Sequence, residues 1–313
     1  MRDSCAREIT YLRISVTDRC NYRCRYCMPE SGVEKCAHSE VCTLEELCGM
    51  AAAAVRCGVR KLRVTGGEPL VRRGIVDLCR MLREIDGVEE LCLTTNGSLL
   101  PALAAPLRAA GVDRLNISLD TLRPERFAAI TRLGTLADVL RGIEAAETAG
   151  FERLKLNCVL LGGVNDDEIA DFVELTQEKP WQVRFIERMP MGICDDYGAY
   201  LPARTVLERC PSLTPCGSDG VASLYRLPDG RGTVGLITPM SHEFCGACSR
   251  IRITADGRLK PCLHSDAEIA LRGLSGAELE QAIRRGILAK PAQHHLNAEG
   301  VTETHRAMNE IGG

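Results

Sequence analysis

Three cysteines, Cys20, Cys24 and Cys27, occupy one short segment directly after the strand-like run 11–17. Thiolates at C-x3-C-x2-C spacing can converge on an iron–sulfur cluster, zinc or Cu(I). A 4Fe–4S cluster usually has four cysteine ligands, so three would leave one iron open to another ligand. Structural zinc normally takes a fourth Cys or His, and this segment contains no His. The spacing therefore favours an open iron–sulfur site over structural zinc or a coincidental grouping.

A second group of three cysteines, Cys245, Cys248 and Cys262, has C-x2-C-x13-C spacing. The intervening segment 252–260 has the pattern of a hairpin, which would return Cys262 to the other two cysteines. Histidines flank this triad, among them His264, and three cysteines with one histidine are an ordinary structural zinc set. The segment by itself favours neither a cluster nor zinc.

Two arginines follow the second triad at alternate positions, Arg250 and Arg252, with apolar Ile251 and Ile253 between and after them. On a strand both guanidinium groups would face the same side. Arginine makes planar bidentate contacts to phosphate, so this pair beside a metal site favours a phosphate-bearing ligand. The alternative is a solvated charged face.

The elements that must position these residues alternate between strand and helix over the first 190 or so residues. Strand-like runs lie at 11–17, 61–65, 90–95, 114–119, 153–161 and 182–187. Helical patterns lie at 43–56, 75–84, 99–109, 124–131, 137–149 and 166–176. Thr43 and Glu46 form a capping-box pattern at the start of the first helix.

This alternation predicts parallel strands joined by helical crossovers. We expect an α/β fold, a partial (β/α)6 barrel, with a doubly wound open sheet as the alternative. Polar motifs follow the carboxyl ends of successive strands, which share one face in such a barrel. They are the first triad, Gly66-Gly67-Glu68-Pro69, Thr94-Thr95-Asn96, Ser118-Leu119-Asp120 and Glu187-Arg188-Met189.

The pattern changes near residue 202. Short strand-like runs at 221–227 and 232–237 predict a small C-terminal antiparallel extension. A final helix is expected at 275–289, followed by a polar, loosely packed tail at 290–313. We therefore expect two domains, residues 1–200 with the first cluster and residues 201–313 with the second metal site and the tail.

The composition of the 313 residues is that of an ordinary globular protein, with 45% hydrophobic and 26% charged residues and a net charge of −3. Nothing in it indicates a nucleic-acid or membrane partner. The charged amino terminus has no signal-peptide pattern and no apolar run is long enough to span a bilayer, so we expect a cytoplasmic protein. Seventeen cysteines, an odd number, favour metal chemistry over a disulfide framework.

The first triad, followed by Gly-Gly-Glu-Pro after the next strand, resembles the radical S-adenosylmethionine (SAM) superfamily. The run 11–18, the C-x2-C-x-R-x-R pattern of the second triad and the terminal Ile311-Gly312-Gly313 further resemble the GTP 3′,8-cyclase family of molybdenum-cofactor biosynthesis. The resemblance covers essentially the whole chain. It implies a barrel of the radical SAM type, SAM and two 4Fe–4S clusters as cofactors, and GTP as substrate.

In that family a 5′-deoxyadenosyl radical removes the ribose 3′ hydrogen of GTP, and the resulting carbon radical attacks C8 of guanine. Reduction of the radical formed by this attack would then give the implied product, (8S)-3′,8-cyclo-7,8-dihydroguanosine 5′-triphosphate. The implied partners are an electron donor such as flavodoxin or ferredoxin, a downstream cyclic pyranopterin monophosphate synthase, and a second copy of the chain in a homodimer.

The resemblance also implies a role for each matching residue. The first cluster would be held by Cys20, Cys24 and Cys27. The second cluster, whose open iron takes guanine, would be held by Cys245, Cys248 and Cys262. The residues implied to contact SAM are Tyr26, Gly67, Glu68, Thr94, Ser118 and Met189. Those implied to line the GTP site are Arg13, Lys61, Arg63, Lys155, Arg184, Arg250 and Arg252. Those implied in catalysis are Arg13, Gly312 and Gly313, the glycines because the family's tail reaches into the active site; a frayed terminus is the alternative.

Two positions depart from the family pattern. Ser249 stands where Asn is common, and His264-Ser265 replaces Phe-Gly. A histidine ligand at the second site would close it to substrate. Two other functions stay open on these residues: a radical SAM enzyme that modifies peptides and carries an auxiliary cluster, and a non-catalytic α/β scaffold stapled by zinc.

Overall fold

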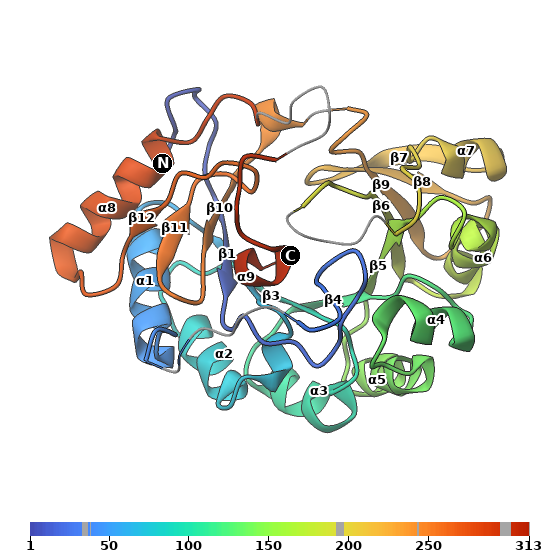
Figure 1. Ribbon diagram of the computed structural model, residues 1–313, viewed down its shortest axis with the longest axis horizontal. Helices are drawn as coiled ribbons and strands as arrows, with labels where there is room; N and C mark the ends of the chain where they lie inside the picture. The colour runs from blue at the N-terminus through green and yellow to red at the C-terminus, as the bar shows by residue number, and fades with distance from the viewer. Residues whose placement is uncertain (33–36, 38, 192–196, 243, 295–301, 313) are drawn as a thin grey trace.

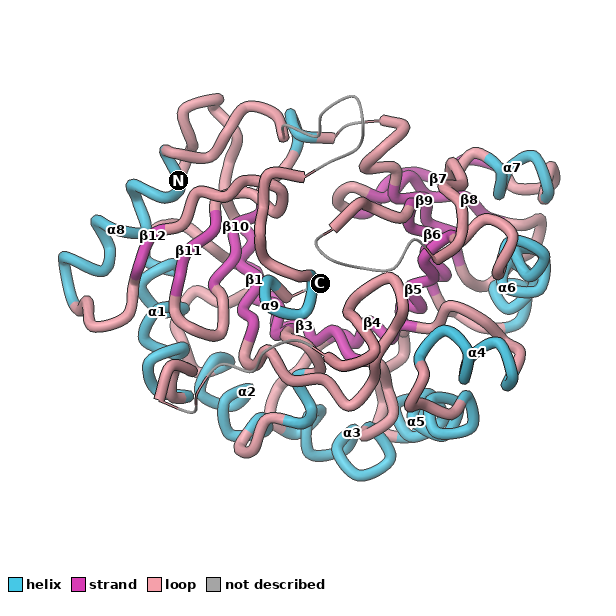
Figure 2. Tube along the Cα trace, viewed as in Figure 1, coloured by secondary structure: helices cyan, strands magenta, loops and turns pink. Residues whose placement is uncertain are grey.

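A computed structural model describes residues 1–32, 37, 39–191, 197–242, 244–294 and 302–312 of the chain. A single curved sheet runs through it, with most helices on its outer side (Figure 1; Figure 2). None of the helices among the described residues has the length and apolar character needed to cross a membrane.

Six parallel strands form the centre of the sheet in the order of the chain. They are β1 (Tyr11–Ser15), β2 (Lys61–Thr65), β3 (Glu90–Thr95), β4 (Arg114–Ser118), β5 (Lys155–Leu160) and β6 (Gln182–Glu187). The helices between them are α1 (Leu44–Arg56), α2 (Ile75–Arg83), α3 (Leu100–Ala109), α4 (Pro124–Thr131), α5 (Leu136–Thr148) and α6 (Ile169–Glu178). Short 3-10 turns precede two of the helices, η1 (Pro69–Val71) and η2 (Asp166–Glu168). The expected alternation and partial barrel are confirmed.

The C-terminal strands extend both edges of this sheet. They are β7 (Thr214–Asp219), β8 (Ala222–Arg226), β9 (Thr233–Ile237), β10 (Arg250–Ile253), β11 (Arg258–Lys260) and β12 (Ile269–Ala270). β9 pairs in parallel with β6 and β10 pairs in parallel with β1, and antiparallel strands follow on each side. The expected antiparallel extension is therefore present but divided in two, because both edges of the central sheet offer unpaired backbone groups.

Alternate positions on the central strands separate the two faces of the sheet. On β1, Leu12 and Ile14 are fully buried in the apolar core, whereas Tyr11 and Arg13 lie on the opposite, concave face. α1 packs on the apolar face and begins at Thr43, whose side chain and that of Glu46 form the predicted capping box. The core therefore lies between the outer face and the helices, which leaves the inner face to polar side chains.

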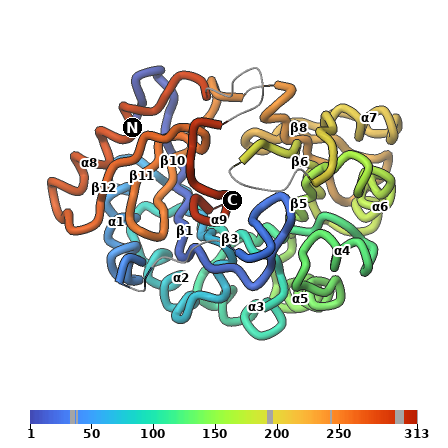
Figure 3. The backbone as a smooth tube through the Cα atoms, viewed as in Figure 1, coloured from blue at the N-terminus to red at the C-terminus, as the bar shows by residue number. Residues whose placement is uncertain are grey.

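The C-terminal segment corrects one expectation. After α7 (Thr205–Arg209), η3 (Cys245–Ala247) and α8 (Gly276–Leu288), the described tail residues 302–312 are not loosely packed. They include the short helix α9 (Met308–Ile311), and Ile311 is fully buried. Figures 1 and 3 show this tail, in red, entering the middle of the curved sheet. Its polar composition was misleading because Arg306 pairs with Glu268 and Asp256, and because the polar side chains of Thr304 and Asn309 are buried.

Candidate active site

The register of the sheet places the predicted cations on one face. Arg252 on β10, Arg13 on β1 and Arg63 on β2 are direct neighbours across three strands. In the next row down, Arg250 and Lys61 flank Tyr11 in the same way. Side chains paired across strands share a face, so these five cations are brought together on the concave side.

The other two predicted cations lie farther along the same face. Lys155 on β5 pairs with Asn116 on β4, and Arg184 on β6 pairs with Asn157 on β5. Thr94 and Ser118 lie on this face as well, because they are the register partners of the same two asparagines. Met189 lies in the loop after β6.

Neutral groups contact several of these cations. Arg63 donates to the hydroxyl of Tyr11 and, at 3.1 Å, to Oγ1 of Thr94. The guanidinium of Arg250 lies 5.2 Å from the centre of the Phe244 ring. Burial, followed by the charge of Arg250, lowers the pKa of Arg252 to about 10, which leaves it charged at neutral pH.

The same face carries two carboxylates that were not predicted from the sequence. Glu90 bridges Lys61 and Arg114, at 2.7 Å to the latter. Asp219, at the end of β7, bridges Lys155 and Arg184, at 2.7 Å to the latter. Burial raises the pKa of Asp219, but a hydrogen bond from Lys155 and the two nearby charges outweigh this and lower it to about 2.

The first triad lies in the loop after β1, against the Gly-Gly-Glu-Pro turn. A Cβ on Gly67 would lie 2.4 Å from the carbonyl oxygen of Arg19, so only glycine allows this approach. The amides of Gly67 and Glu68 donate to the carbonyls of Thr17 (2.8 Å) and Arg19 (2.8 Å). The turn therefore holds the backbone that leads into Cys20.

Glu68 is almost fully buried, and its carboxylate binds the chain itself. It accepts from the amide of Leu70 (3.0 Å), the hydroxyl of Thr95 (2.7 Å) and the amide of Asn96 (2.7 Å). Burial raises its pKa to about 7 despite these donors. Its side chain therefore links the segment after β2 to the end of β3 and holds the two strand ends together.

Tyr26 lies inside the first triad, and residues at the ends of β4 and β5 hold its side chain. Its hydroxyl donates to Oδ2 of Asp120 at 2.6 Å, and Oδ1 of Asp120 accepts from the amide of Val159 at 2.8 Å. Burial raises the pKa of Asp120 to about 6. The loop of the first triad is thus tied to the ends of β4 and β5.

The second triad lies between η3, β10 and β11 at one edge of the sheet. Burial raises the pKa of Cys248, but the charges of Arg250 and Lys290 and hydrogen bonds from Arg250 outweigh it and lower the pKa to about 7. A partly buried thiol with a lowered pKa suits a metal ligand, because the thiolate is the ligating form.

His264 has partners of its own. Its Nδ1 lies 3.2 Å from the hydroxyl of Thr302, and its ring centre lies 5.0 Å from that of His294. Burial lowers its pKa to about 4, so the ring is neutral at pH 7.

Three features of the described residues bear on metal binding. None of the cysteines among them forms a disulfide bond. No group of three or more His, Cys, Asp or Glu side chains among them is arranged to hold a single metal ion. The two cysteine triads nevertheless fit iron–sulfur clusters by their donor type and by the loops that carry them.

The last described residues of the tail lie beside the cation row, the neighbouring side chains of Arg252, Arg13 and Arg63. The carbonyl oxygen of Gly312 accepts from Nη1 of Arg252 at 2.5 Å. Gly312 has φ +82°, and a Cβ there would lie 2.2 Å from Oγ1 of Thr65, so glycine is required twice over. Gly313 lies outside the described residues.

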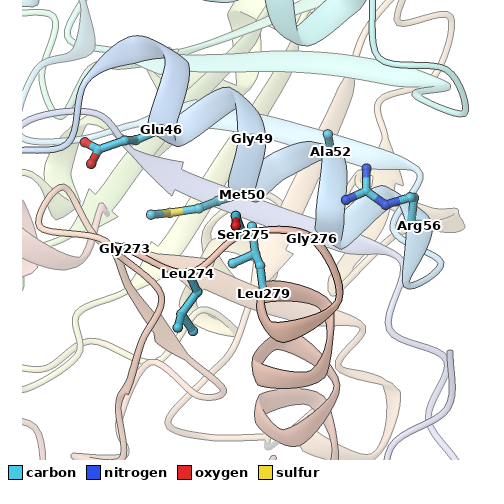
Figure 4. A pocket seen from close by; sticks show the side chains of 10 residues that line it. All are labelled: Glu46, Gly49, Met50, Ala52, Arg56, Gly273, Leu274, Ser275, Gly276 and Leu279. Carbon is cyan, nitrogen blue, oxygen red and sulfur yellow. The ribbon is translucent and has the colours of Figure 1, made fainter.

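Two shallow pockets lie away from this face. One of about 270 Å³ is formed where α1 meets the start of α8 (Figure 4). The other lies beside α6 and α7. None of the residues predicted for the site lines either pocket.

Sequence reasoning missed several polar residues of the inner face and its surroundings, namely Tyr11, Glu90, Arg114, Asn116, Asn157 and Asp219. Most of them alternate with apolar residues on predicted strands, so the same period that identified the cations could have found them. Asp219 gives no such signal, because the segment 214–219 contains Pro215 and Gly217 and does not have a strand-like pattern.

Comparisons with known proteins agree with this geometry. The model of the radical SAM superfamily matches residues 14–176, more than half of the chain, and the model named Molybdenum Cofactor Synthesis C matches residues 181–296. Among solved structures, SuiB of Streptococcus suis bound to S-adenosylmethionine has a TM-score of 0.66 and 14% identity, over 89% of this chain and 68% of that chain. Native anSMEcpe with bound AdoMet has a TM-score of 0.56 and 16% identity, over 86% and 80%. At these identities the two structures show the fold alone.

Fold, first triad and family model together define a radical SAM protein. Comparison with curated relatives narrows the radical SAM class to one enzymatic activity. GTP 3′,8-cyclases of Alkaliphilus oremlandii and Heliobacterium modesticaldum are 46% and 48% identical over 321 and 330 residues, which cover all of both chains. That of Geobacter sulfurreducens is 47% identical over 322 residues and 99% of each chain. The chain belongs to the GTP 3′,8-cyclase family.

Proposed function

We propose that this chain is a radical SAM lyase that converts GTP to (8S)-3′,8-cyclo-7,8-dihydroguanosine 5′-triphosphate in molybdenum-cofactor biosynthesis. The observation that carries the proposal is one concave face that bears seven predicted cations, with one cysteine triad in the loop after β1 and the other at the edge of the sheet beside β10. A polyanionic nucleotide needs such a concentration of positive charge.

SAM and two 4Fe–4S clusters are the cofactors. When bound and reduced, the first cluster supplies the electron that cleaves SAM to methionine and the 5′-deoxyadenosyl radical, which removes the ribose 3′ hydrogen. Cys20, Cys24 and Cys27 hold this cluster, and Gly67 lets the turn approach its loop. The remaining residues assigned to SAM are Tyr26, Glu68, Thr94, Ser118 and Met189.

Cys245, Cys248 and Cys262 would hold the second cluster, which would bind the guanine of GTP. The cations assigned to the triphosphate and ribose are Arg13, Lys61, Arg63, Lys155, Arg184, Arg250 and Arg252. Four of them, Arg63, Lys155, Arg184 and Arg252, are at most 9% exposed, which supports this, because buried like charges gain most from a bound anion.

Gly312 and Gly313 are assigned to catalysis, and Gly312 contacts one of the cations of the site. The contact between the carbonyl of Gly312 and Arg252 supports a role in orienting this guanidinium toward substrate. Arg13, the neighbour of both Arg252 and Arg63, lies at the centre of the row and is assigned to catalysis.

The wider assignments belong to the same proposal. Residues 1–200 form the radical SAM unit and residues 201–313 carry the second cluster and the tail. The protein is a cytoplasmic homodimer that receives electrons from a flavodoxin or ferredoxin. Its product passes to a cyclic pyranopterin monophosphate synthase.

The test is anaerobic iron and sulfide analysis, followed by incubation with GTP, SAM and a reductant. We expect about eight irons and eight sulfides per chain, 5′-deoxyadenosine, and the cyclic nucleotide. The Cys24→Ala variant should make neither product while keeping its circular dichroism spectrum. One zinc per chain and no SAM cleavage would instead support the zinc-stapled scaffold. SAM cleavage with peptide but not with GTP would support the peptide-modifying alternative.

A further inference from the structure

The first residues of the chain form a closed loop against the second triad. The amide of Asp3 donates to the carbonyl of Arg7 at 3.0 Å, and Nε of Arg7 donates to Oδ2 of Asp3 at 2.6 Å. Both side chains are buried, with relative exposures of 6% and 0%. A buried ion pair is costly unless its remaining donors are also used, so the other contacts of Arg7 decide its role.

Arg7 uses its other nitrogens to join two distant segments. Nη1 donates to the carbonyl of Cys245 at 2.9 Å and to that of Ala292 at 3.0 Å. Nη2 donates to the carbonyl of Pro291 at 2.7 Å. The guanidinium therefore fixes the first cysteine of the second triad to the segment that follows α8.

Lys290 makes the matching contacts from that segment. It is only 4% exposed, and its Nζ donates to the carbonyls of Arg250 (2.9 Å) and Pro261 (2.8 Å). Arg250 lies two residues after Cys248, and Pro261 directly precedes Cys262. Arg7 and Lys290 together thus bind backbone carbonyls beside all three cysteines.

The backbone of the amino-terminal segment adds a further link. The amides of Thr10 and Tyr11 both donate to the carbonyl of Ser249, at 3.2 and 3.1 Å, directly after Cys248. The same segment continues into β1, which carries Arg13. The second triad is therefore held in register with the cation row from its amino-terminal side.

We propose that Arg7 and Lys290, with Asp3 as the counter-ion of Arg7, are positioning residues for the second 4Fe–4S cluster. They hold the two loops that carry the three cysteines in one arrangement and place buried positive charge beside an anionic cluster. This inference rests on the proposed function, which supplies the cluster. Because a nearby cation stabilises the more negative, reduced state, the charges also raise the reduction potential of that cluster.

The test compares Lys290→Met with Asp3→Asn in the reconstituted holoenzyme. We expect Lys290→Met to lower the reduction potential of the second cluster and to lose its iron several-fold faster. Asp3→Asn removes the counter-ion of Arg7, which leaves a net positive charge beside Cys245, so it should raise the potential. The readouts are an anaerobic redox titration followed by electron paramagnetic resonance, and iron per chain over time. A role limited to holding the fold would not give shifts of opposite sign.

The matched control is Arg126→Met, which removes a partly buried cation on α4 that pairs with Asp167 and Glu168. It should change neither the potential nor the retention of iron. Should Lys290→Met fail to fold by circular dichroism, Asp3→Asn alone decides, because it keeps the size of the side chain. Equal potentials in Asp3→Asn and the wild type, or shifts of the same sign in both variants, would overturn the inference.

Failure of this inference differs from failure of the proposed function. If the wild-type protein holds about four irons and makes no cyclic nucleotide, the proposed function is wrong. If it holds about eight irons and makes the product, but the variants match it in potential and iron retention, only the roles of Arg7, Lys290 and Asp3 are wrong.

Discussion

Lys155 and Arg184 share the carboxylate of Asp219 deep in the concave face, and this arrangement governs how both cations respond to pH and to ligand. Burial, followed by the charge of Arg184, lowers the pKa of Lys155 to about 8. Lys155 therefore loses its charge when the pH rises slightly above neutral. A hydrogen bond to a charged group typically contributes about 1.5 to 3 kcal/mol.

The affinity for GTP should consequently fall as the pH rises through about 8, by roughly tenfold once Lys155 is neutral. Titration calorimetry between about pH 6.5 and 9.5 measures this. The Lys155→Met variant should already bind roughly tenfold more weakly at pH 7 and show a flatter profile. Lys179→Met, a surface change, should reproduce the wild-type curve. Equal slopes in wild type and Lys155→Met would remove Lys155 from the nucleotide site.

Replacing Asp219 by Asn should have the opposite effect on binding at pH 7. The substitution removes a negative charge next to two cations, so GTP should bind several-fold more tightly at low salt, less so at high salt. The protein without ligand should melt at a lower temperature, because Lys155 and Arg184 lose their counter-ion. Asp77→Asn, on the exposed side of α2, serves as the control. Weaker binding by Asp219→Asn would contradict this account.

At the scale of elements, the C-terminal tail is held by an ion-pair network and not by apolar packing alone. Arg306 bonds to Glu268 at 2.6 Å and to Asp256 at 2.8 Å. Lys260, fully buried, donates to the hydroxyl of Thr304 at 3.2 Å. These contacts fix the segment that delivers Gly312 to Arg252.

Weakening the network with Arg306→Met should lower the free energy of unfolding by about 2 kcal/mol, since two partly buried carboxylates lose their nearest cation. It should also uncouple the reaction, with 5′-deoxyadenosine still formed but less cyclic nucleotide per SAM cleaved. Thermal melting and product analysis measure the two effects. Arg56→Met, which breaks an exposed pair with Glu280, should affect neither. Unchanged coupling in Arg306→Met would show that the tail finds its place without this anchor.

At the scale of the whole molecule, both triads lie at the rim or edge of a sheet whose apolar core comes mainly from other residues. The core side chains of β1 to β6 pack against α1 to α6, and the loop of the first triad adds Tyr22, which packs against Phe127. The fold should therefore survive the loss of its metal centres.

Removal of iron by an anaerobic chelator should leave the far-ultraviolet circular dichroism spectrum nearly unchanged while activity is lost. The melting temperature should fall by several degrees, because bound cofactors stabilise the folded state by mass action. Cys24→Ala should show an intermediate fall, because it loses the first cluster alone. Loss of helical signal on chelation would mean that the clusters hold the fold together.

The sequence predicted some elements and residues of the fold and failed to predict others. The positions of β2, β3 and β6 followed directly from their apolar periodicity, and both triads from the spacing of cysteines. The division of the C-terminal strands between the two edges did not follow, because pairing between distant strands leaves no local pattern. Nor did the packing of the tail, since its charges are indistinguishable from surface charges until their partners are known.

The sequence by itself determined the chemistry, because ligand type, glycine turns and the alternation of cations with apolar residues are local properties of the chain. Tertiary structure alone decided which groups meet. It placed Asp219 against Lys155, Gly312 against Arg252, and Arg7 and Lys290 around the second triad. The physical reason is that a buried charge must find a partner wherever the fold offers one, and sequence distance places no limit on that choice.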